Sequence, residues 1–254
     1  MEVCVLASGS KGNVTLIKSK SINIFIDLGP TCSYVEERLK ELDINPESIK
    51  AILVTHTHSD HIKGLKVFLK KYHPTLYVTE KMLADLQGEM PPFSYHLIEG
   101  DFTIEDITVH VIKTSHDASD SNGYIVEEGK NSVVYMTDTG FINRKYFDTL
   151  KNRSVYIMES NHDVEKLLKG RYPYQLRRRV LSDRGHLSNI DSSNYLANFI
   201  GENTKEIVLA HLSEENNTKE LALSTLYGVF EEHGIHFDKV IVSEQYEKTE
   251  LIHL

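Results

Sequence analysis

The sequence predicts an α/β fold whose helices pack on the outside of sheet layers. Two observations carry this prediction: short apolar segments alternate with longer segments whose apolar residues recur at helical spacing, and several strands follow one another as meanders. The chain has 254 residues, of which 40% are hydrophobic, so it can bury a sizeable core. Because no change in composition divides the chain, we expect one domain over residues 1–254.

The N-terminal part begins with strands, and the first two are joined by a polar turn at residues 8–13. Apolar residues spaced three and four apart then indicate amphipathic helices between further strands. In chain order we predict strands at 3–6, 14–17 and 22–26, a helix at 34–42, a strand at 51–54, a helix at about 62–71 and a strand at 76–78.

The middle of the chain is rich in strands, and the C-terminal part alternates strands with helices. Two of the middle strands form a hairpin through the turn at residues 128–131. We predict strands at 102–104, 107–112, 123–127 and 133–136, a helix from Lys145, a strand at 155–158, helices at 164–169 and 191–199, a strand at 207–209, a helix at 218–232, a strand at 240–242 and a final edge strand.

The formal net charge of −9 argues against a protein that coats nucleic acid without specificity, because phosphate binding needs local positive charge. A nuclease is not excluded, since bound metal ions add charge that a residue count misses. Residues 165–184 carry seven basic side chains against two acidic ones, which marks a local cationic stretch. The alternative interpretation of this stretch is an ordinary solvated helix face.

Two cysteines, Cys4 and Cys32, are too few for a disulfide framework, so we expect reduced thiols and an intracellular protein. The N-terminus lacks the basic and apolar regions of a signal peptide. No apolar segment is long enough to span a bilayer. The expectation is therefore a soluble, cytoplasmic protein without a membrane partner.

A cluster of metal-ligand side chains follows the predicted strand at residues 51–54 and comprises His56, His58, Asp60 and His61. In an extended turn alternate residues point the same way, so His56 and His58 can converge on one metal ion. Asp60 and His61 lie where a helix begins and can face a second ion. Imidazole and carboxylate suit zinc, and also manganese or iron. The alternative is a polar loop that is rich in histidine by chance.

Three further candidates each come just after an apolar strand: His116, Asp138 and His211. Strand ends that gather at one edge of a sheet would place such groups together, although any one of them alone is compatible with a structural role. The remaining histidines have no partner at ligand spacing, and we expect them to be structural or exposed: His73, His96, His110, His233, His236 and His253.

This series of motifs resembles that of the metallo-β-lactamase fold superfamily over essentially the whole chain. The resemblance implies a four-layered αββα sandwich and two divalent metal ions, zinc or manganese, with iron also possible. It implies that one ion is held by His56, His58 and His116, that the other is held by Asp60, His61 and His211, and that Asp138 bridges them. Asp27, which follows the strand at residues 22–26, matches the first motif of the superfamily, which implies support of the metal loop.

Asp60 narrows the resemblance to a part of this superfamily. An aspartate at this place is typical of glyoxalase II-like and RNase Z-like hydrolases, whereas many β-lactamases have another residue there. The chain is also similar to the YycJ/WalJ subgroup at residues 6–13, 114–117, 159–163, 185–189 and 210–213. This subgroup is associated with exonuclease action on DNA with 5′ to 3′ polarity. The resemblance therefore implies a nucleic-acid substrate, DNA in particular.

Other residues in these motifs are candidates for substrate contact. Ser8, Ser10 and Asn13 lie in a glycine-containing turn that can hold a phosphate, the alternative being an ordinary strand turn. His186 is a candidate catalytic residue that protonates the leaving oxygen or clamps the phosphate; the alternative is a histidine bonded to backbone. His162 is a candidate for contact with substrate near the site, the alternative being a structural role.

The arginines at residues 177–179, namely Arg177, Arg178 and Arg179, suit bidentate phosphate contacts along a strand. The main hypothesis is phosphodiester hydrolysis by a hydroxide shared between two metals, with Asp60 and His186 as catalytic residues. Two rival hypotheses are a small-molecule hydrolase of the same fold, acting on a cyclic phosphodiester or a thioester, and a non-catalytic metal-binding module. The oligomeric state does not follow from the sequence.

Overall fold

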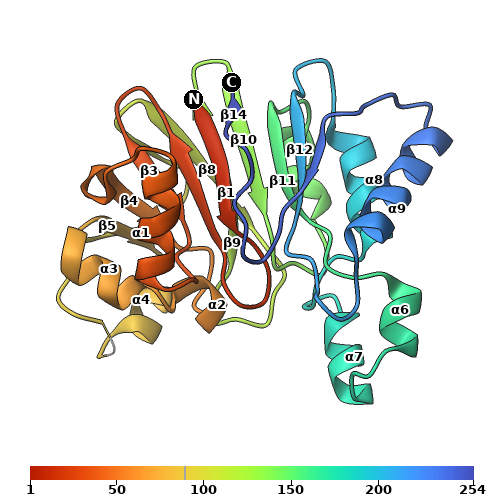
Figure 1. The fold of residues 1–254 in the computed structure, drawn as a ribbon, viewed down its shortest axis with the longest axis horizontal. Coiled ribbons are helices and arrows are strands. Elements are labelled where there is room, and N and C mark those ends of the chain that lie inside the picture. The colour runs from red at the N-terminus through yellow and green to blue at the C-terminus, as the bar shows by residue number, and fades with distance from the viewer. Residues whose placement is uncertain (89) are drawn as a thin grey trace.

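Two β-sheets lie face to face in the middle of the molecule, and helices cover their outer faces (Figure 1). The structure is a computed structural model that describes residues 1–88 and 90–254. In spatial order the strands of the first sheet are β14 (Ile252–His253), β1 (Glu2–Ala7), β2 (Val14–Lys18), β3 (Asn23–Ile26), β4 (Ile49–Leu53), β5 (Thr75–Val78) and β6 (Tyr95–Leu97). Those of the second sheet are β13 (Val240–Val242), β12 (Glu206–Ala210), β11 (Val155–Glu159), β10 (Asn131–Met136), β9 (Asn122–Glu128), β8 (Ile107–Lys113) and β7 (Phe102–Ile104).

Helices flank this pair of sheets on both outer sides. The first sheet is covered by α1 (Cys32–Glu41), α3 (Leu65–Tyr72) and α4 (Glu80–Leu86). The second sheet is covered by α8 (Asn189–Phe199) and α9 (Lys219–Glu232). The shorter helices are η1 (Pro46–Ser48), α2 (Ser59–Ile62), η2 (Arg144–Tyr146), α5 (Phe147–Leu150), α6 (Val164–Lys169) and α7 (Tyr174–Val180). The predicted α/β sandwich of four layers is confirmed.

The strands are apolar on both faces because helices cover one side of each sheet and the other sheet covers the second side. In β11, Tyr156 and Met158 pack toward α8 and α9, whereas Val155 and Ile157 pack between the sheets. In β1, Cys4 and Leu6 face the helices of the first sheet, and their neighbours Val3 and Val5 face the second sheet. A strand that is covered on both sides loses the polar positions of a surface strand.

The carboxyl ends of several strands meet at one edge of the sandwich, where α2 lies in Figure 1. Strand β3 runs parallel to β4, and β10, β11 and β12 run parallel to one another. Because parallel neighbours end at the same edge, the residues that follow these strands converge there. The opposite edge carries the two chain ends, and β1 pairs with β14 there.

The structure differs from the sequence-based expectations in a few elements. The helix expected at about 62–71 is interrupted, because α2 ends at Ile62 and α3 begins only at Leu65. Gly64 lies between them, and a Cβ there would come within 2.1 Å of the Pro30 carbonyl oxygen. Four short elements were not predicted, namely η1, α4, β6 and α7.

None of the helices in the described residues is long and apolar enough to cross a membrane. Cys4 and Cys32 are both buried, and neither forms a disulfide within this described part of the chain.

Candidate metal centre

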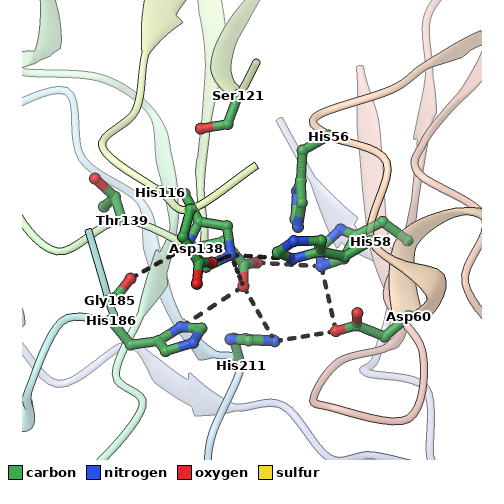
Figure 2. Close-up of polar contacts among 12 residues, drawn as sticks. His56, His58, Asp60, His116, Ser121, Asp138, Thr139, Gly185, His186 and His211 are labelled. Carbon is green, nitrogen blue, oxygen red and sulfur yellow. Dashed lines mark hydrogen bonds and ion pairs between the residues drawn. The ribbon is translucent and has the colours of Figure 1, made fainter. Parts of the chain in front are cut away.

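Five loops that each follow a strand bring histidines and carboxylates together at this edge. The segment after β4 carries His56, His58, Asp60 and His61, and the last two lie on α2. The loop after β3 carries Asp27, and the other contributing loops follow β8, β10 and β12 and carry His116, Asp138 and His211. Figure 2 shows most of these side chains directed toward a common centre. All of the residues that the sequence proposes as metal ligands are therefore neighbours in space.

His56, His58 and His116 form the first ligand group, and their ring nitrogens lie within 4.8 Å of one another. His56 Nδ1 lies 3.1 Å from Thr55 Oγ1, which leaves Nε2 facing the centre, and this atom is buried without a hydrogen-bond partner among the described residues. His116 Nδ1 lies 3.2 Å from the Gly185 carbonyl oxygen, so its Nε2 also faces inward. His58 presents Nδ1, which lies 3.2 Å from His116 Nε2.

Asp60, His61 and His211 form the second ligand group. His61 Nε2 lies 3.5 Å from Asp60 Oδ2, and His211 Nε2 lies 3.7 Å from the same oxygen. His211 Nε2 is buried and has no hydrogen-bond partner within the described chain. Three donors thus point at one small space from three directions.

Asp138 lies between the two groups. Its Oδ2 is 3.2 Å from His61 Nε2, while its Oδ1 is 3.6 Å from His211 Nε2 and 3.8 Å from His116 Nε2. The side chain is only 4% exposed, and Oδ2 makes no hydrogen bond with the described residues. A buried carboxylate oxygen without a donor is costly unless a cation satisfies it. These orphaned atoms and the imidazole–carboxylate donor set fit divalent metal ions.

Asp27 supports this centre from behind, where it is fully buried. Its Oδ1 accepts a hydrogen bond from Thr55 N at 2.8 Å, and its Oδ2 accepts one from Thr55 Oγ1 at 2.8 Å. Oδ2 also lies 2.7 Å from His61 Nδ1. A carboxylate that holds one ring nitrogen orients the other toward a metal. This arrangement corresponds to the support that the resemblance implies for Asp27.

Glu159 likewise orients two histidines by contacting one ring nitrogen of each. No role for this residue was predicted from the sequence. Its Oε1 lies 2.8 Å from His186 Nδ1 and 2.9 Å from His211 Nδ1. Its Oε2 accepts hydrogen bonds from Thr139 N at 3.0 Å and from Leu187 N at 3.2 Å. Glu159 is the last residue of β11, so the strand-end signal that marks Asp138 could have found it.

The electrostatics of the site come from buried carboxylates that face buried imidazoles. Burial alone would lower the pKa of His211, but Asp138, Asp60 and Glu159 raise it to about 10. Burial lowers the pKa of His56 well below its usual range, and the nearby His61 adds to this shift. The negative field that stabilises an imidazolium also attracts a divalent cation, so metal ions and protons compete for the site.

Three residues of the site adopt a strained backbone conformation. Asp27, Asp138 and His211 all adopt the left-handed region, with φ of 60°, 54° and 56°. Few residues other than glycine adopt this region, and it persists where the surrounding structure enforces it. The left-handed turn directly after a strand directs each side chain into the site instead of along the sheet.

Of the three candidate phosphate-binding side chains in the turn, two are buried and one is exposed. Ser8 is buried, and its Oγ accepts a hydrogen bond from His211 N at 2.8 Å. Asn13 is fully buried, with Oδ1 accepting from Gly9 N at 2.8 Å and Nδ2 donating to Gly9 O at 3.0 Å. These two side chains brace the turn and the site, whereas the exposed Ser10 lines the metal cavity. Asn13 Nδ2 also lies 3.1 Å from His61 Nε2 and 3.4 Å from Asp60 Oδ2, so this side chain reaches the centre itself. Contact of Ser8 and Asn13 with a phosphate stays a prediction.

His186 and His162 occupy different environments. His186 lines the cavity, and its ring centroid lies 5.1 Å from that of His116 and 5.4 Å from that of His211. Burial lowers the pKa of His186, but Glu159 outweighs this and raises the pKa above its ordinary value. His162 is buried outside the residues that line the cavity, and burial lowers its pKa to about 4.

The side chains of the three arginines at residues 177–179 have different surroundings, because consecutive helix residues point in directions about 100° apart. Arg179 lines the cavity and forms a two-pronged ion pair with Asp117. Arg177 donates to the Leu168 carbonyl, and Arg178 lies over the Tyr174 ring at 5.8 Å. The cavity has a volume of about 230 Å³ and is lined by Ser10, His58, Asp60, His116, Asp138, Asn161, Tyr172, Leu176, Arg179, Val180, His186, His211, Leu212 and Ser213.

Comparison with known proteins gives a family match and close relatives. A family model described as the Beta-lactamase superfamily domain matches residues 23–211. The chain is 39% identical over 235 residues to exodeoxyribonuclease YycJ of Bacillus anthracis, a match that covers 91% of this chain and 89% of that protein. It is 38% identical over 229 residues to exodeoxyribonuclease WalJ of Streptococcus pneumoniae, which covers 87% of this chain and 85% of that one.

Solved structures share the fold at low sequence identity. The metallo-β-lactamase fold protein YhfI of Bacillus subtilis superposes with a TM-score of 0.74 at 17% identity and covers 98% of both chains. Zinc-bound PqqB of Methylobacterium extorquens superposes with a TM-score of 0.71 at 12% identity, covering 98% of this chain and 100% of that one.

Proposed function

We propose that this chain, which belongs to the β-lactamase superfamily, is a two-metal nuclease that removes nucleotides from DNA ends in the 5′ to 3′ direction. The family match confirms the resemblance to YycJ/WalJ proteins, and the chain is a metal-dependent hydrolase of phosphodiester bonds. DNA as the substrate, two as the number of metal ions and the direction of digestion are the proposal. The observation that carries it is the pair of ligand groups on either side of Asp138.

The proposed ligands form one group for each metal ion. His56, His58 and His116 would hold one ion, while Asp60, His61 and His211 would hold the other, with Asp138 shared between them. When bound, the two ions would supply Lewis acidity and a water of lowered pKa. Zinc and manganese both suit this donor set, and iron is also compatible.

The side chains around the metal groups can bind and orient a phosphodiester. His186 keeps Nδ1 against Glu159, so its Nε2 is available to hold or protonate an oxygen of the scissile phosphate. Arg179 offers a planar guanidinium at the same cavity, a geometry that matches phosphate oxygens. Ser10 contributes a hydroxyl to the lining of this cavity.

Digestion of labelled DNA tests this function. Linear DNA labelled at either the 5′ or the 3′ end, a covalently closed circle and RNA of the same sequence are incubated with the metal-loaded protein. We expect release of the 5′ label as short products, no cleavage of the circle, and loss of all activity with a chelator or in the His58→Ala variant. Intact linear DNA after incubation with metal-loaded protein would refute the proposal.

Salt dependence separates a nuclease from a hydrolase of small phosphodiesters. Binding of a polyanion weakens steeply as salt rises, because cationic side chains release counterions from the strand. We expect KM for DNA to rise steeply between low and moderate salt. Efficient hydrolysis of a cyclic mononucleotide with little salt dependence, without DNA cleavage, would favour the small-molecule alternative.

A further inference from the structure

A second cavity opens directly beside the metal cavity. Its volume is about 440 Å³, which lies within the range of about 300–1,000 Å³ typical of small-molecule sites. It shares Ser10 and Asp60 with the metal cavity, so the two cavities are adjacent. Its lining consists of Ser10, Lys11, Gly29, Pro30, Thr31, Tyr34, Ser59, Asp60, Lys63, Gln245 and Tyr246. We call it the side cavity.

We propose that the side cavity binds the terminal nucleotide of the DNA strand, the unit that hydrolysis releases. This inference rests on the proposed nuclease function and adds a binding site to it. The site takes a nucleoside monophosphate unit, with the phosphate near Lys63 and the base against Tyr246.

The cationic groups of the side cavity suit a phosphate next to the scissile one. Lys63 follows α2 directly, the helix that carries Asp60, and it is exposed. It forms no ion pair with the residues that the structure describes, so its ammonium group is available. Lys11 is already engaged, because its Nζ lies 2.7 Å from Glu214 Oε2. Lys63 is therefore the cation that a ligand would meet.

Tyr246 provides a face on which a base can stack. Its side chain is 56% exposed, and Lys11 Nζ lies 5.5 Å from the ring centroid. Aromatic side chains stack on every base, which allows binding without sequence preference. A ring and an ammonium group in one cavity match the two ends of a nucleotide.

The walls of the side cavity are held in place before any ligand binds. Gln245 Oε1 accepts a hydrogen bond from Lys11 N at 2.9 Å, and Gln245 Nε2 donates to Gly12 O at 3.2 Å. Asn13 N donates to Asp60 O at 2.8 Å, which ties the same turn to α2. These bonds join three segments that are far apart in the sequence, so little ordering is needed on binding.

The far side of the metal cavity suits the rest of the strand. Arg179, Leu176 and Tyr172 line that side, and α6 and α7 extend outward from the sheets there (Figure 1). This segment contains the cationic stretch at residues 165–184, which can follow several phosphates. A polymer therefore fits the α7 side, and the side cavity has room for one terminal unit.

With the 5′-terminal nucleotide in the side cavity, the proposed reaction has a defined product. Hydrolysis breaks the P–O3′ bond that joins the terminal nucleotide to the next one; the phosphorus gains a hydroxyl group from water, and O3′ gains the proton. The terminal nucleotide then leaves the side cavity with a free 3′ hydroxyl. The phosphate stays on the new strand end, which can enter the cavity next.

Binding of deoxythymidine 5′-monophosphate to the metal-loaded protein, followed by calorimetry, tests the site directly. We expect Lys63→Ala and Tyr246→Ala each to weaken binding about 5- to 10-fold, which is about 1–1.4 kcal/mol. The first variant loses a cation for the phosphate, and the second loses the ring on which the base stacks. The matched control is Lys66→Ala, which removes an exposed lysine of α3 that does not line the side cavity. We expect its affinity to stay within about twofold of wild type.

Product analysis separates the two proposals. With 5′-labelled DNA we expect mononucleotides from the wild type, and longer products and a raised KM from Lys63→Ala and Tyr246→Ala. If DNA is digested but neither variant changes product length or mononucleotide affinity, the side cavity is not the terminal site and the nuclease function stands. If DNA stays intact while mononucleotide binding depends on Lys63, the nuclease function is wrong and the nucleotide site stands.

Discussion

Replacing Glu159 with glutamine is expected to weaken the metal site without altering any proposed ligand. The carboxylate accepts from two imidazoles through Oε1 and from two backbone N–H groups through Oε2. The amide of a glutamine has only one acceptor oxygen. Because the backbone donors cannot change, the oxygen will face Thr139 and Leu187, and the NH2 group will face His186 and His211.

This orientation forces a change in the two histidines. Their Nδ1 atoms must become acceptors, so the ring proton moves to Nε2, the atom with which His211 faces the metal centre. Loss of such a supporting carboxylate typically lowers metal affinity about 10- to 100-fold. At about 1.4 kcal/mol per factor of ten, this is a loss of about 1.4–2.8 kcal/mol.

Metal titration of the apo protein against a fluorescent chelator measures this effect. We expect the Glu159→Gln variant to bind one of two ions more weakly, while the ion held by His56, His58 and His116 keeps its affinity within about twofold. Glu165→Gln is the matched control, because that side chain is 75% exposed on α6. Equal affinity of wild type and Glu159→Gln for both ions would refute the tautomer argument.

Four further predictions concern stability. Removal of metal by a chelator should lower Tm by roughly 5–10 °C. A ligand at 100 times its Kd adds about 2.7 kcal/mol to the free energy of unfolding, and each kcal/mol shifts Tm by about 2–4 °C at this chain length. An unchanged Tm would contradict binding of metal. Burial lowers the pKa of His110, but Asp101 and Glu127 outweigh it and raise the pKa. The stabilisation of the fold by these ion pairs is complete below the unfolded pKa of about 6.5 and is lost as pH rises through the folded pKa. His110→Gln should therefore lower the free energy of unfolding by up to about 1 kcal/mol at pH 6 and by less at pH 9, as measured by urea unfolding. Equal losses at both pH values would contradict the ion pairs. Gly29→Ala should destabilise by about 1–3 kcal/mol, because its Cβ would come within 1.6 Å of a backbone carbonyl oxygen. Gly228→Ala in α9, where a Cβ meets nothing within 4 Å, should instead stabilise by about 0.5–1 kcal/mol.

The fold class was predictable from the sequence because most strands are buried on both faces and are therefore apolar throughout. The elements that escaped prediction lack this signal. Strand β6 is three residues long and exposed, with β5 as its partner. Helix α7 begins after Pro173 and carries three consecutive arginines, so its apolar face is reduced to little more than Leu176 and Val180.

The site was predictable to the extent that it follows one rule, that polar residues after strands running in the same direction meet at one edge of a sheet. This rule located His116, Asp138 and His211, and it applies equally to Glu159. The orientation of side chains was not predictable in the same way. Whether Ser8 faces a phosphate or braces His211 depends on the path of the turn, which only the packing of distant segments determines.

The pairing of Arg179 with Asp117 bears on how an acidic protein binds DNA. Asp117 directly follows His116, and its carboxylate lies 3.5 Å from His116 Nε2, so it adds negative charge at the metal centre. Arg179 neutralises that carboxylate while it lines the cavity. Bound divalent ions would take over this neutralisation, because they offset the carboxylates of the site more strongly than one guanidinium does. Arg179 would then be free for a phosphate, which couples metal binding to substrate binding. We therefore expect Asp117→Asn to lower KM for DNA most where metal is limiting, and a KM ratio that is independent of metal concentration would contradict this coupling.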